Sequence, residues 1–149
     1  MSAEVRSARA EDVPRMAELI TGEHLPAYGL DEFLETFFVL TDGDEVVGCA
    51  GLEVYGEAAL LRSVVVAPER RRRDEGRLLV EAALSEARRR GVARVYLFTM
   101  SADAFFGRLG FREVQPEEFE EAVRASRQYE AVSRIPELRA RIKAMALEL

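Results

Sequence analysis

Short apolar segments, some alternating with polar residues and some continuous, predict strands separated by turns. Alternation over residues 4–9 predicts a first strand, and the Asp-Gly pair at 42–43 predicts a hairpin whose second strand covers residues 45–55. The unbroken apolar run at residues 60–66 is typical of a strand that is buried on both faces. Further extended segments are predicted at residues 38–40, 94–99 and 111–114, and a final strand within residues 139–149.

Helical periodicity fills the intervals between these strands. Acidic residues and Pro14 favour a helix that opens within residues 10–14, and a longer helix over residues 76–90 is expected to stop at Gly91. Shorter helices are predicted at residues 30–37, 101–109 and 116–127. The length of 149 residues fits a single domain that spans residues 1–149.

Four residues inside or beside these elements have specific expectations. Gly48 and Gly51 lie within a strand, which predicts a bulge or a close approach of neighbouring backbone. Cys49 is the single cysteine, and its apolar surroundings predict a buried, inert thiol. His24 is the single histidine, and we place it at the end of the first helix or in the loop that follows. A Ser-His-Asp triad would need His24, and no nucleophile elbow accompanies it, so we expect neither such a triad nor a metal site.

Composition narrows the class of protein further. Hydrophobic residues make up 48 %, which is enough for a core, and the formal net charge of −6 disfavours a general nucleic-acid binder. No apolar segment has the length of a membrane span, and the N-terminus has no signal-like apolar region. We therefore expect a soluble cytoplasmic protein without nucleic-acid or membrane partners.

A run of four arginines, residues 70–73, stands out against this acidic background. It follows the apolar strand at residues 60–66 and Pro68, and it precedes a helix. The first amides of a helix have no partner within the helix, and together with the helix dipole they favour an anion such as phosphate. Arginine adds charge and a forked set of donors that suits phosphate. A solvated charged face and a nucleic-acid patch are the other interpretations, and the second lacks interleaved aromatic residues.

Two segments resemble signatures of the GCN5-related N-acetyltransferase (GNAT) superfamily, and they follow one another in the order typical of that family. Residues 71–76, Arg-Arg-Arg-Asp-Glu-Gly, resemble the acetyl-CoA loop written [Q/R]-x-x-G-x-[G/A]. Residues 104–111, Ala-Phe-Phe-Gly-Arg-Leu-Gly-Phe, resemble the [LF]-Y-x-x-x-G-F end of the A-x-x-[LF]-Y-x-x-x-G-F signature. Residues 61–63, 98–99 and 123–126 are similar to small acetyltransferases found with arsenic-resistance genes, and these in turn resemble the acetyltransferase domain of N-acetylglutamate synthase.

The resemblance implies a fold, a cosubstrate and a reaction. The fold is the α/β (α+β) acyl-CoA N-acyltransferase fold, with a mixed, mostly antiparallel central sheet flanked by helices. The reaction is direct transfer of an acetyl group from acetyl-CoA to the amine of a small molecule, with amino acids among the candidates. A homodimer is an expectation that follows from the family. The residues that the resemblance assigns to acetyl-CoA are Val64, Val65, Val66, Arg71, Arg72, Arg73, Asp74, Glu75, Gly76, Arg77 and Phe106.

Two positions depart from the family pattern. Asp74 replaces the first glycine of the loop, and its charge would repel a charge ~5 Å away by roughly 3 kcal/mol at an effective dielectric constant of about 20, before screening by salt. Its side chain is free to point outward and pair with Arg70 or Arg73. Phe106 stands where many relatives have a tyrosine that donates a proton to the leaving thiolate, and we interpret it as packing against the coenzyme. If Asp74 has abolished binding, the alternative is a degenerate GNAT fold that serves as a binding or interaction module.

Four further residues are candidates for catalysis and for acceptor binding. Glu53 is our first candidate for the general base and Glu57 the second, with an ordinary surface carboxylate as the alternative for each. Arg62 interrupts the apolar strand, either as a clamp on a substrate carboxylate or as a side chain on an exposed face. Arg124 is a second candidate for acceptor binding, because the related proteins carry a similar run there.

Overall fold

The computed structural model describes residues 3–71 and 73–149, so the role predicted for Arg72 lies outside the described residues. Seven strands follow one another across the sheet in the order β1-β2-β3-β4-β5-β7-β6. β1–β2, β2–β3, β5–β7 and β6–β7 pair antiparallel, and β4 pairs parallel with β5. The predicted mixed, mostly antiparallel sheet flanked by helices is therefore confirmed. The strands are β1 Glu4–Ser7, β2 Phe37–Asp42, β3 Glu45–Tyr55, β4 Ala58–Val66, β5 Arg94–Thr99, β6 Arg112–Val114 and β7 Lys143–Glu148.

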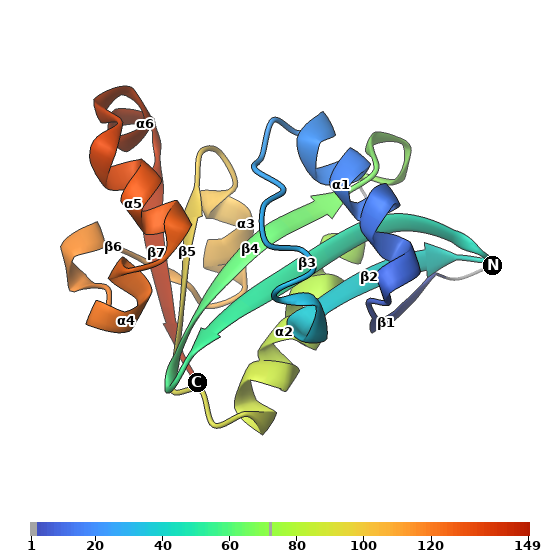
Figure 1. Ribbon diagram of the computed structural model, residues 1–149, viewed down its shortest axis with the longest axis horizontal. Coiled ribbons are helices and arrows are strands. Elements are labelled where there is room, and N and C mark those ends of the chain that lie inside the picture. Colours follow the sequence, from blue (N-terminus) through green and yellow to red (C-terminus); the bar gives the residue numbers. More distant parts are fainter. Residues whose placement is uncertain (1–2, 72) are drawn as a thin grey trace. The chain divides into compact units, whose positions relative to one another are not determined.

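Six α-helices and four short 3₁₀ turns are found in the described residues (Figure 1). Within this part of the chain, no helix is both long enough and apolar enough to cross a bilayer. The helices are α1 Val13–Gly22, α2 Glu75–Arg89, α3 Asp103–Arg108, α4 Glu121–Arg124, α5 Arg127–Arg134 and α6 Pro136–Arg141. The 3₁₀ turns are η1 Ala10–Asp12, η2 Leu34–Thr36, η3 Pro68–Arg70 and η4 Pro116–Glu118.

Two of the predicted helices are wrong in extent. Residues 30–37 contain only the turn η2, because Gly29 adopts a positive φ of 70° and Phe37 already belongs to β2. The single helix expected over residues 116–127 is divided among η4, α4 and α5. Glu120 and Ser126 have extended backbone, and the Ser126 side chain accepts a hydrogen bond from the Tyr129 amide, which starts a new helix at Arg127.

The first of two units consists of Met1–Glu53 with Leu61–Arg89. In Figure 1, α1 (blue) and α2 (yellow-green) lie on opposite faces of β1, β2 and β3. The apolar face of α1 is fully buried at Met16 and Ile20, and α2 contributes Leu79 to the same core. Both helices therefore cover a sheet whose central strands are apolar on both sides.

Glycines let the backbone of β3 approach its neighbours closely, as predicted. A Cβ atom on Gly48 would lie 2.9 Å from the carbonyl oxygen of Val65, and one on Gly51 would lie 2.3 Å from the Phe37 ring. The register between β2 and β3 also shifts, from Leu40 opposite Gly48 to Thr41 opposite Val46. This shift is a bulge that leaves one extra residue on β3.

The second unit consists of Val54–Leu60 with Arg90–Leu149. Its core is built around Phe119, whose ring centroid lies 4.4 Å from that of Tyr96 and 5.0 Å from that of Phe98. β7 pairs with β5 on one side and β6 on the other, so the predicted final strand is confirmed. It begins at Lys143, after the short helix α6.

We expect Gly51→Ala to destabilise the protein by about 1–3 kcal/mol, because the added methyl group overlaps the buried Phe37 ring. The matched control is Gly22→Ala at the end of α1, where a Cβ would meet no atom within 4 Å. The control should leave stability unchanged or raise it by up to about 1 kcal/mol. Chemical denaturation of both variants measures the difference, and equal midpoints would contradict the packing argument.

Candidate functional site

The end of β4 contains a kink at Ser63. Its φ of 57° is in the left-handed region, which is unusual for a serine in the middle of a strand. The Cys49 thiol donates a hydrogen bond to the Ser63 carbonyl oxygen at 3.4 Å, and Arg62 Nε donates one to Ser63 Oγ at 3.0 Å. Strained backbone of this kind persists only when its surroundings hold it, and it concentrates at functional sites.

The residues after this kink are those assigned to acetyl-CoA from the sequence. Val65 is buried and packs into the core of the first unit, while Val64 and Val66 are half-buried. The parallel pairing with β5 covers Ala58–Leu60 opposite Arg94–Tyr96, and β4 continues for six further residues to Val66. Donation from the Val64 and Val66 amides to a thioester stays a prediction.

Arg62 and Glu53 form a buried ion pair beside the kink. Arg62 Nη1 lies 2.9 Å from Glu53 Oε2, and the two side chains are only 3 % and 1 % exposed. Arg62 Nη2 donates to the Pro26 carbonyl oxygen at 3.2 Å, and the guanidinium lies 4.2 Å from the centroid of the Tyr28 ring. The exposed-face interpretation of Arg62 and the surface-carboxylate interpretation of Glu53 are therefore wrong. The strand alternation could not reveal this, since the loop that covers Arg62 comes from residues 26–29.

Arg70 has a structural role in the segment of residues 70–74, which we call the arginine loop. Its guanidinium makes two hydrogen bonds to the Glu75 carboxylate, at 3.0 and 2.7 Å, and one to Asp42 at 2.6 Å. The Arg70 side chain is 8 % exposed, and the Glu75 side chain is 10 % exposed. This cluster joins the last residue of β2, η3 and the first residue of α2. The Glu75 side chain, predicted to lie at the coenzyme, is thus engaged by Arg70.

The other charged residues of the loop are more exposed. Arg71 pairs with Glu23 at 2.5 Å and is half-exposed, and Arg73 is exposed. Asp74 has a φ of 61°, the left-handed conformation in which the family signature has glycine. Its carboxylate accepts a hydrogen bond from Arg77 Nε at 2.8 Å, so the partner is Arg77 and not the predicted Arg70 or Arg73. Both side chains of this pair are substantially exposed.

Three predicted site residues belong to the second unit. Glu57 is exposed in the turn between β3 and β4, and its carbonyl oxygen accepts a hydrogen bond from the Ala93 amide at 2.7 Å. Phe106 is buried in α3 and makes an edge-to-face contact with Phe111 at 5.7 Å between ring centroids. Arg124 is exposed at the end of α4. The roles assigned to these residues stay predictions.

The Cys49 thiol is expected to be a poor nucleophile. Its side chain is fully buried, and burial raises the pKa of its thiol to about 12. The thiolate is the nucleophilic form of cysteine, so very little nucleophile exists at neutral pH. The burial of the thiol expected from the sequence is confirmed, and its inertness stays a prediction. What the sequence did not indicate is the contact with Ser63, because Cys49 and Ser63 lie on different strands.

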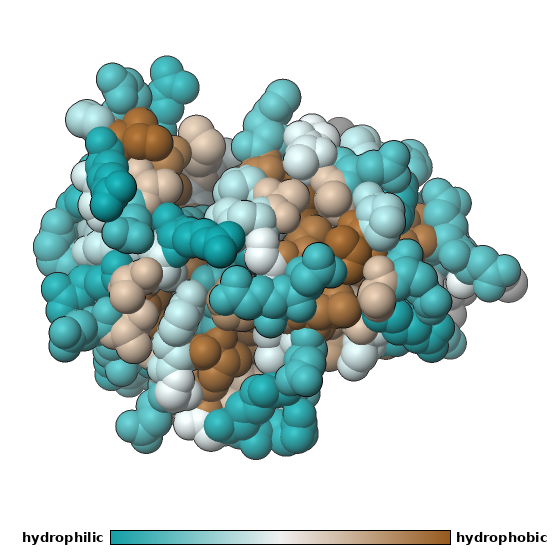
Figure 2. Space-filling model, in the orientation of Figure 1, coloured by the Kyte–Doolittle hydropathy of each residue, from teal (hydrophilic) through white to brown (hydrophobic). Residues whose placement is uncertain are grey.

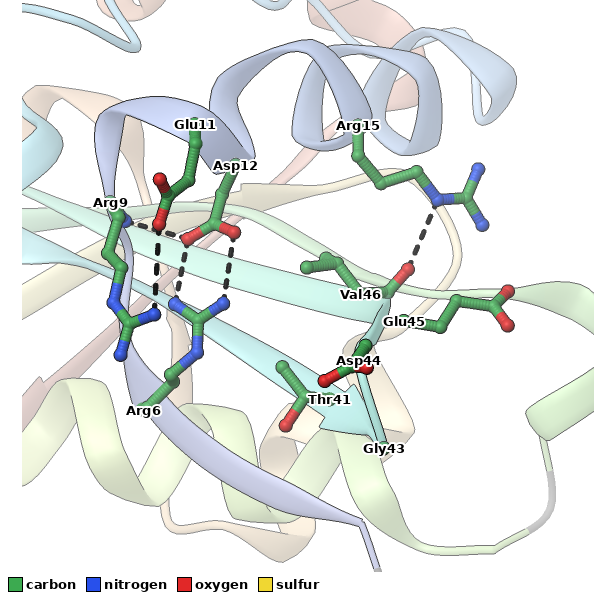
Figure 3. Close-up of a pocket in the computed structure, with 10 residues that line it drawn as sticks. All are labelled: Arg6, Arg9, Glu11, Asp12, Arg15, Thr41, Gly43, Asp44, Glu45 and Val46. Carbon is green, nitrogen blue, oxygen red and sulfur yellow. Dashed lines mark hydrogen bonds and ion pairs between the residues drawn. The ribbon is translucent and has the colours of Figure 1, made fainter.

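A pocket of about 540 Å³ lies in the first unit, where β1, η1 and α1 meet the β2–β3 turn (Figure 3). Four of its charged side chains interact in pairs. Arg6 makes two hydrogen bonds to Asp12, at 2.8 and 3.0 Å, and Arg9 lies 3.7 Å from Glu11. The hydrogen bonds from Arg6 lower the pKa of Asp12 below its usual value. Among the described residues that line this pocket, none belongs to β4 or to the arginine loop, so the pocket is separate from the residues assigned to acetyl-CoA.

The visible face of the molecule is largely hydrophilic, with small apolar areas between charged side chains (Figure 2). Among the described residues, the exposed large hydrophobic side chains are Leu78, Met100 and Ile135. They belong to α2, to the segment after β5 and to the junction of α5 and α6.

Comparison with known proteins identifies the family. The model of the Acetyltransferase (GNAT) domain matches residues 34–113, which is more than half of the chain. An uncharacterised N-acetyltransferase of Chlorobaculum tepidum is 32 % identical over 127 residues, which cover 80 % of this chain and 81 % of that protein. The chain belongs to the GNAT family of acyl-CoA-dependent N-acetyltransferases, as the two sequence signatures predicted.

More distant relatives share the fold or part of the sequence. An amino-acid acetyltransferase of Mannheimia succiniciproducens is 26 % identical, over 90 % of this chain and 33 % of that protein. A Mycobacterium tuberculosis protein in complex with CoA and NLQ is 25 % identical with a TM-score of 0.83, over 98 % of this chain and 99 % of that one. N-acetylglutamate synthase from Neisseria gonorrhoeae, complexed with coenzyme A and N-acetyl-glutamate, has a TM-score of 0.84 at 20 % identity. The whole of this chain aligns with the synthase but covers only 35 % of the synthase chain. In the same way, this chain covers about a third of the amino-acid acetyltransferase.

We expect Cys49 in the folded protein to resist alkylation by iodoacetamide at pH 7–8, because its thiol is buried and protonated. Mass spectrometry should detect full modification only after denaturation. The control is the same reaction in denaturant, where an accessible thiol of ordinary pKa reacts quickly. Rapid labelling of the native protein would show that the β3–β4 region opens far more readily than the packing indicates.

Asp12 should make stability depend on acidic pH. Since its pKa is lower in the folded protein than the ordinary 3.8, its contribution is complete above that value and is lost as the pH falls through the folded-state pKa. We expect Asp12→Asn to cost about 1–2 kcal/mol at pH 7 and much less at pH 2. Urea titrations at both pH values measure this, with Asp44→Asn at the exposed β2–β3 turn as the control. A cost that is equal at the two pH values would contradict the assignment.

Proposed function

We propose that this GNAT domain transfers the acetyl group of acetyl-CoA to the amine of a small molecule of the amino-acid class. The observation that carries this proposal is the kink at Ser63, followed within twelve residues by the N-terminus of the fifteen-residue helix α2. The sequence relationship to an amino-acid acetyltransferase and the fold shared with a protein solved with CoA and NLQ support the choice of substrates.

Different parts of the first unit would hold the two halves of the cosubstrate. The amides of Val64 and Val66 are our candidates to bind the pantetheine arm, much as an added strand would. The pyrophosphate would lie at the start of α2, where the amides of Glu75, Gly76 and Arg77 carry the positive end of the helix dipole. Arg71 and Arg73 can add positive charge there, whereas Arg70 is already held by Glu75 and Asp42.

The residues present are compatible with direct attack of the acceptor amine on the thioester. The neutral amine nitrogen attacks the thioester carbonyl carbon, and an amide of β4 donates a hydrogen bond to the carbonyl oxygen as negative charge develops. A carbon–nitrogen bond forms, the carbon–sulfur bond breaks, and the amine proton passes to a base, for which Glu53 and Glu57 remain our candidates. The departing thiolate takes its proton from water, because Phe106 has none to donate. No acyl-enzyme is needed, and the Cys49 thiol is unsuited to form one.

Calorimetry with acetyl-CoA, together with an assay of thiol release across the twenty L-amino acids and simple alkylamines, tests the proposal. We expect saturable binding of acetyl-CoA and thiol release that depends on an amino acid. Absence of both binding and turnover would favour the degenerate binding module instead. Turnover with alkylamines but not with amino acids would reject the acceptor class and keep the reaction. The homodimer stays a prediction, and light scattering of the full chain tests it.

We expect Asp74→Gly to bind coenzyme A about 3- to 10-fold more tightly than the wild type. Glycine adopts the positive φ of this position without strain and removes a negative charge from the pyrophosphate region. Asp74→Asn is the matched variant, since asparagine tolerates the same backbone but is neutral, so it isolates the effect of charge. Calorimetry measures both affinities. If both variants bind like the wild type, Asp74 does not face the coenzyme.

A further inference from the structure

Arg62 links three segments of the first unit that are distant in the sequence. It lies on β4, its ion-pair partner Glu53 lies on β3, and its other contacts are to Pro26 and Tyr28 in the loop between α1 and η2. The same guanidinium donates to Ser63 Oγ at the kink. One side chain therefore joins the kinked strand to a loop that precedes it by more than thirty residues.

The burial of this pair needs an explanation other than stability. Removing two charges from water costs several kcal/mol per ion, and apolar residues of similar volume often stabilise a core equally well. Both side chains are nevertheless almost completely buried, at 3 % and 1 % exposure. The contacts instead fix geometry, because the planar guanidinium sets the relative positions of Ser63, Glu53 and the loop.

We propose, on the basis of the function proposed above, that Arg62 is a positioning residue for the acceptor. It holds the loop at residues 26–29 against the kink, so that this loop forms a wall of the site where the amine meets the thioester. Arg62 does not itself clamp the acceptor carboxylate. Each of its three nitrogens already donates to a protein oxygen, and the Tyr28 ring lies against the guanidinium.

Lysine cannot replace this arrangement. Its single ammonium group is a point charge, which cannot satisfy the Ser63 hydroxyl, the Glu53 carboxylate and the Pro26 carbonyl in the geometry of the planar fork. A displacement of about 1 Å in a positioned reactant can cost on the order of 100-fold in rate. The variant should lower kcat/KM for the acceptor and leave the affinity for acetyl-CoA almost unchanged. The reason is that the coenzyme contacts expected at Val64–Val66 and at the start of α2 do not involve the Arg62 side chain.

The main experiment compares Arg62→Lys with the wild type and with Arg6→Lys, a control in which another ion-paired arginine of the same unit is changed. We expect Arg62→Lys to reduce kcat/KM for the acceptor by about 10- to 100-fold, and to change the dissociation constant of acetyl-CoA by less than about threefold. Arg6→Lys should leave both values unchanged. A weakened acetyl-CoA affinity with an unchanged acceptor kcat/KM would overturn the proposal.

Acceptors with and without a carboxylate distinguish positioning from clamping. The probes are L-glutamate and its α-amide, or the best amino acid of the panel and its α-amide if glutamate is not accepted. If Arg62 positions the loop, Arg62→Lys reduces turnover of both by a similar factor. If the loss is confined to the acceptor that has the free carboxylate, Arg62 is a clamp and the proposal fails.

Hydrogen exchange measured by mass spectrometry tests the loop without any substrate. We expect peptides covering residues 24–33 to exchange faster in Arg62→Lys than in the wild type, with no such change in Arg6→Lys. Equal exchange would overturn the proposal. This measurement also separates the two proposals, because it remains decisive even if the wild type transfers no acetyl group.

One further variant covers the case in which Arg62→Lys fails to fold. Tyr28→Leu removes the ring that lies against the guanidinium but leaves the ion pair intact, and it should give the same faster exchange and lower acceptor kcat/KM to a smaller extent. Exchange and acceptor kcat/KM that both equal those of the wild type would overturn the proposal.

Discussion

The left-handed backbone at Ser63 is the constraint on which the rest of the site depends. A serine in this conformation within a strand is strained, and the strain persists because Cys49 bonds its carbonyl oxygen and Arg62 bonds its hydroxyl. Arg62 in turn is held by Glu53. The kink is therefore maintained by a chain of buried contacts that begins on β3. The strand that leaves the kink leads through η3 to the start of α2.

The arginine loop divides into a structural part and an exposed part. Arg70 is enclosed by Glu75 and Asp42 and fixes the loop to the β2–β3 turn. Arg71 and Arg73 remain exposed or half-exposed near the helix start, and Asp74 offsets the charge of Arg77. A run of like charges in the sequence thus gives less free positive charge than its length suggests. Backbone amides therefore contribute a larger share of the binding of an anion at this position, and the sequence alone does not show which amides these are.

Much of the fold follows from local sequence patterns. Alternation over residues 4–9 predicted β1, the Asp-Gly turn predicted the hairpin of β2 and β3, and the apolar run at residues 60–66 predicted most of β4. Gly48 and Gly51 indicated close backbone approach because glycine in a strand rarely has another reason. The errors are found where local preference competes with tertiary contacts. In place of the helix expected at residues 30–37 the chain has the turn η2 and then the start of β2, where Phe37 pairs with Gly51 of β3.

The sequence by itself determined the family, the order of the strands, and the position of the acetyl-CoA signature, since each is encoded by residues close together along the chain. Only the tertiary structure decided what the charged side chains do. Whether Arg62 meets water, substrate or Glu53, and whether Arg70 is free or enclosed, depends on segments that are distant in sequence and adjacent in space. A side chain's charge is a local property, but its burial and its partner are set by the packing of the whole unit.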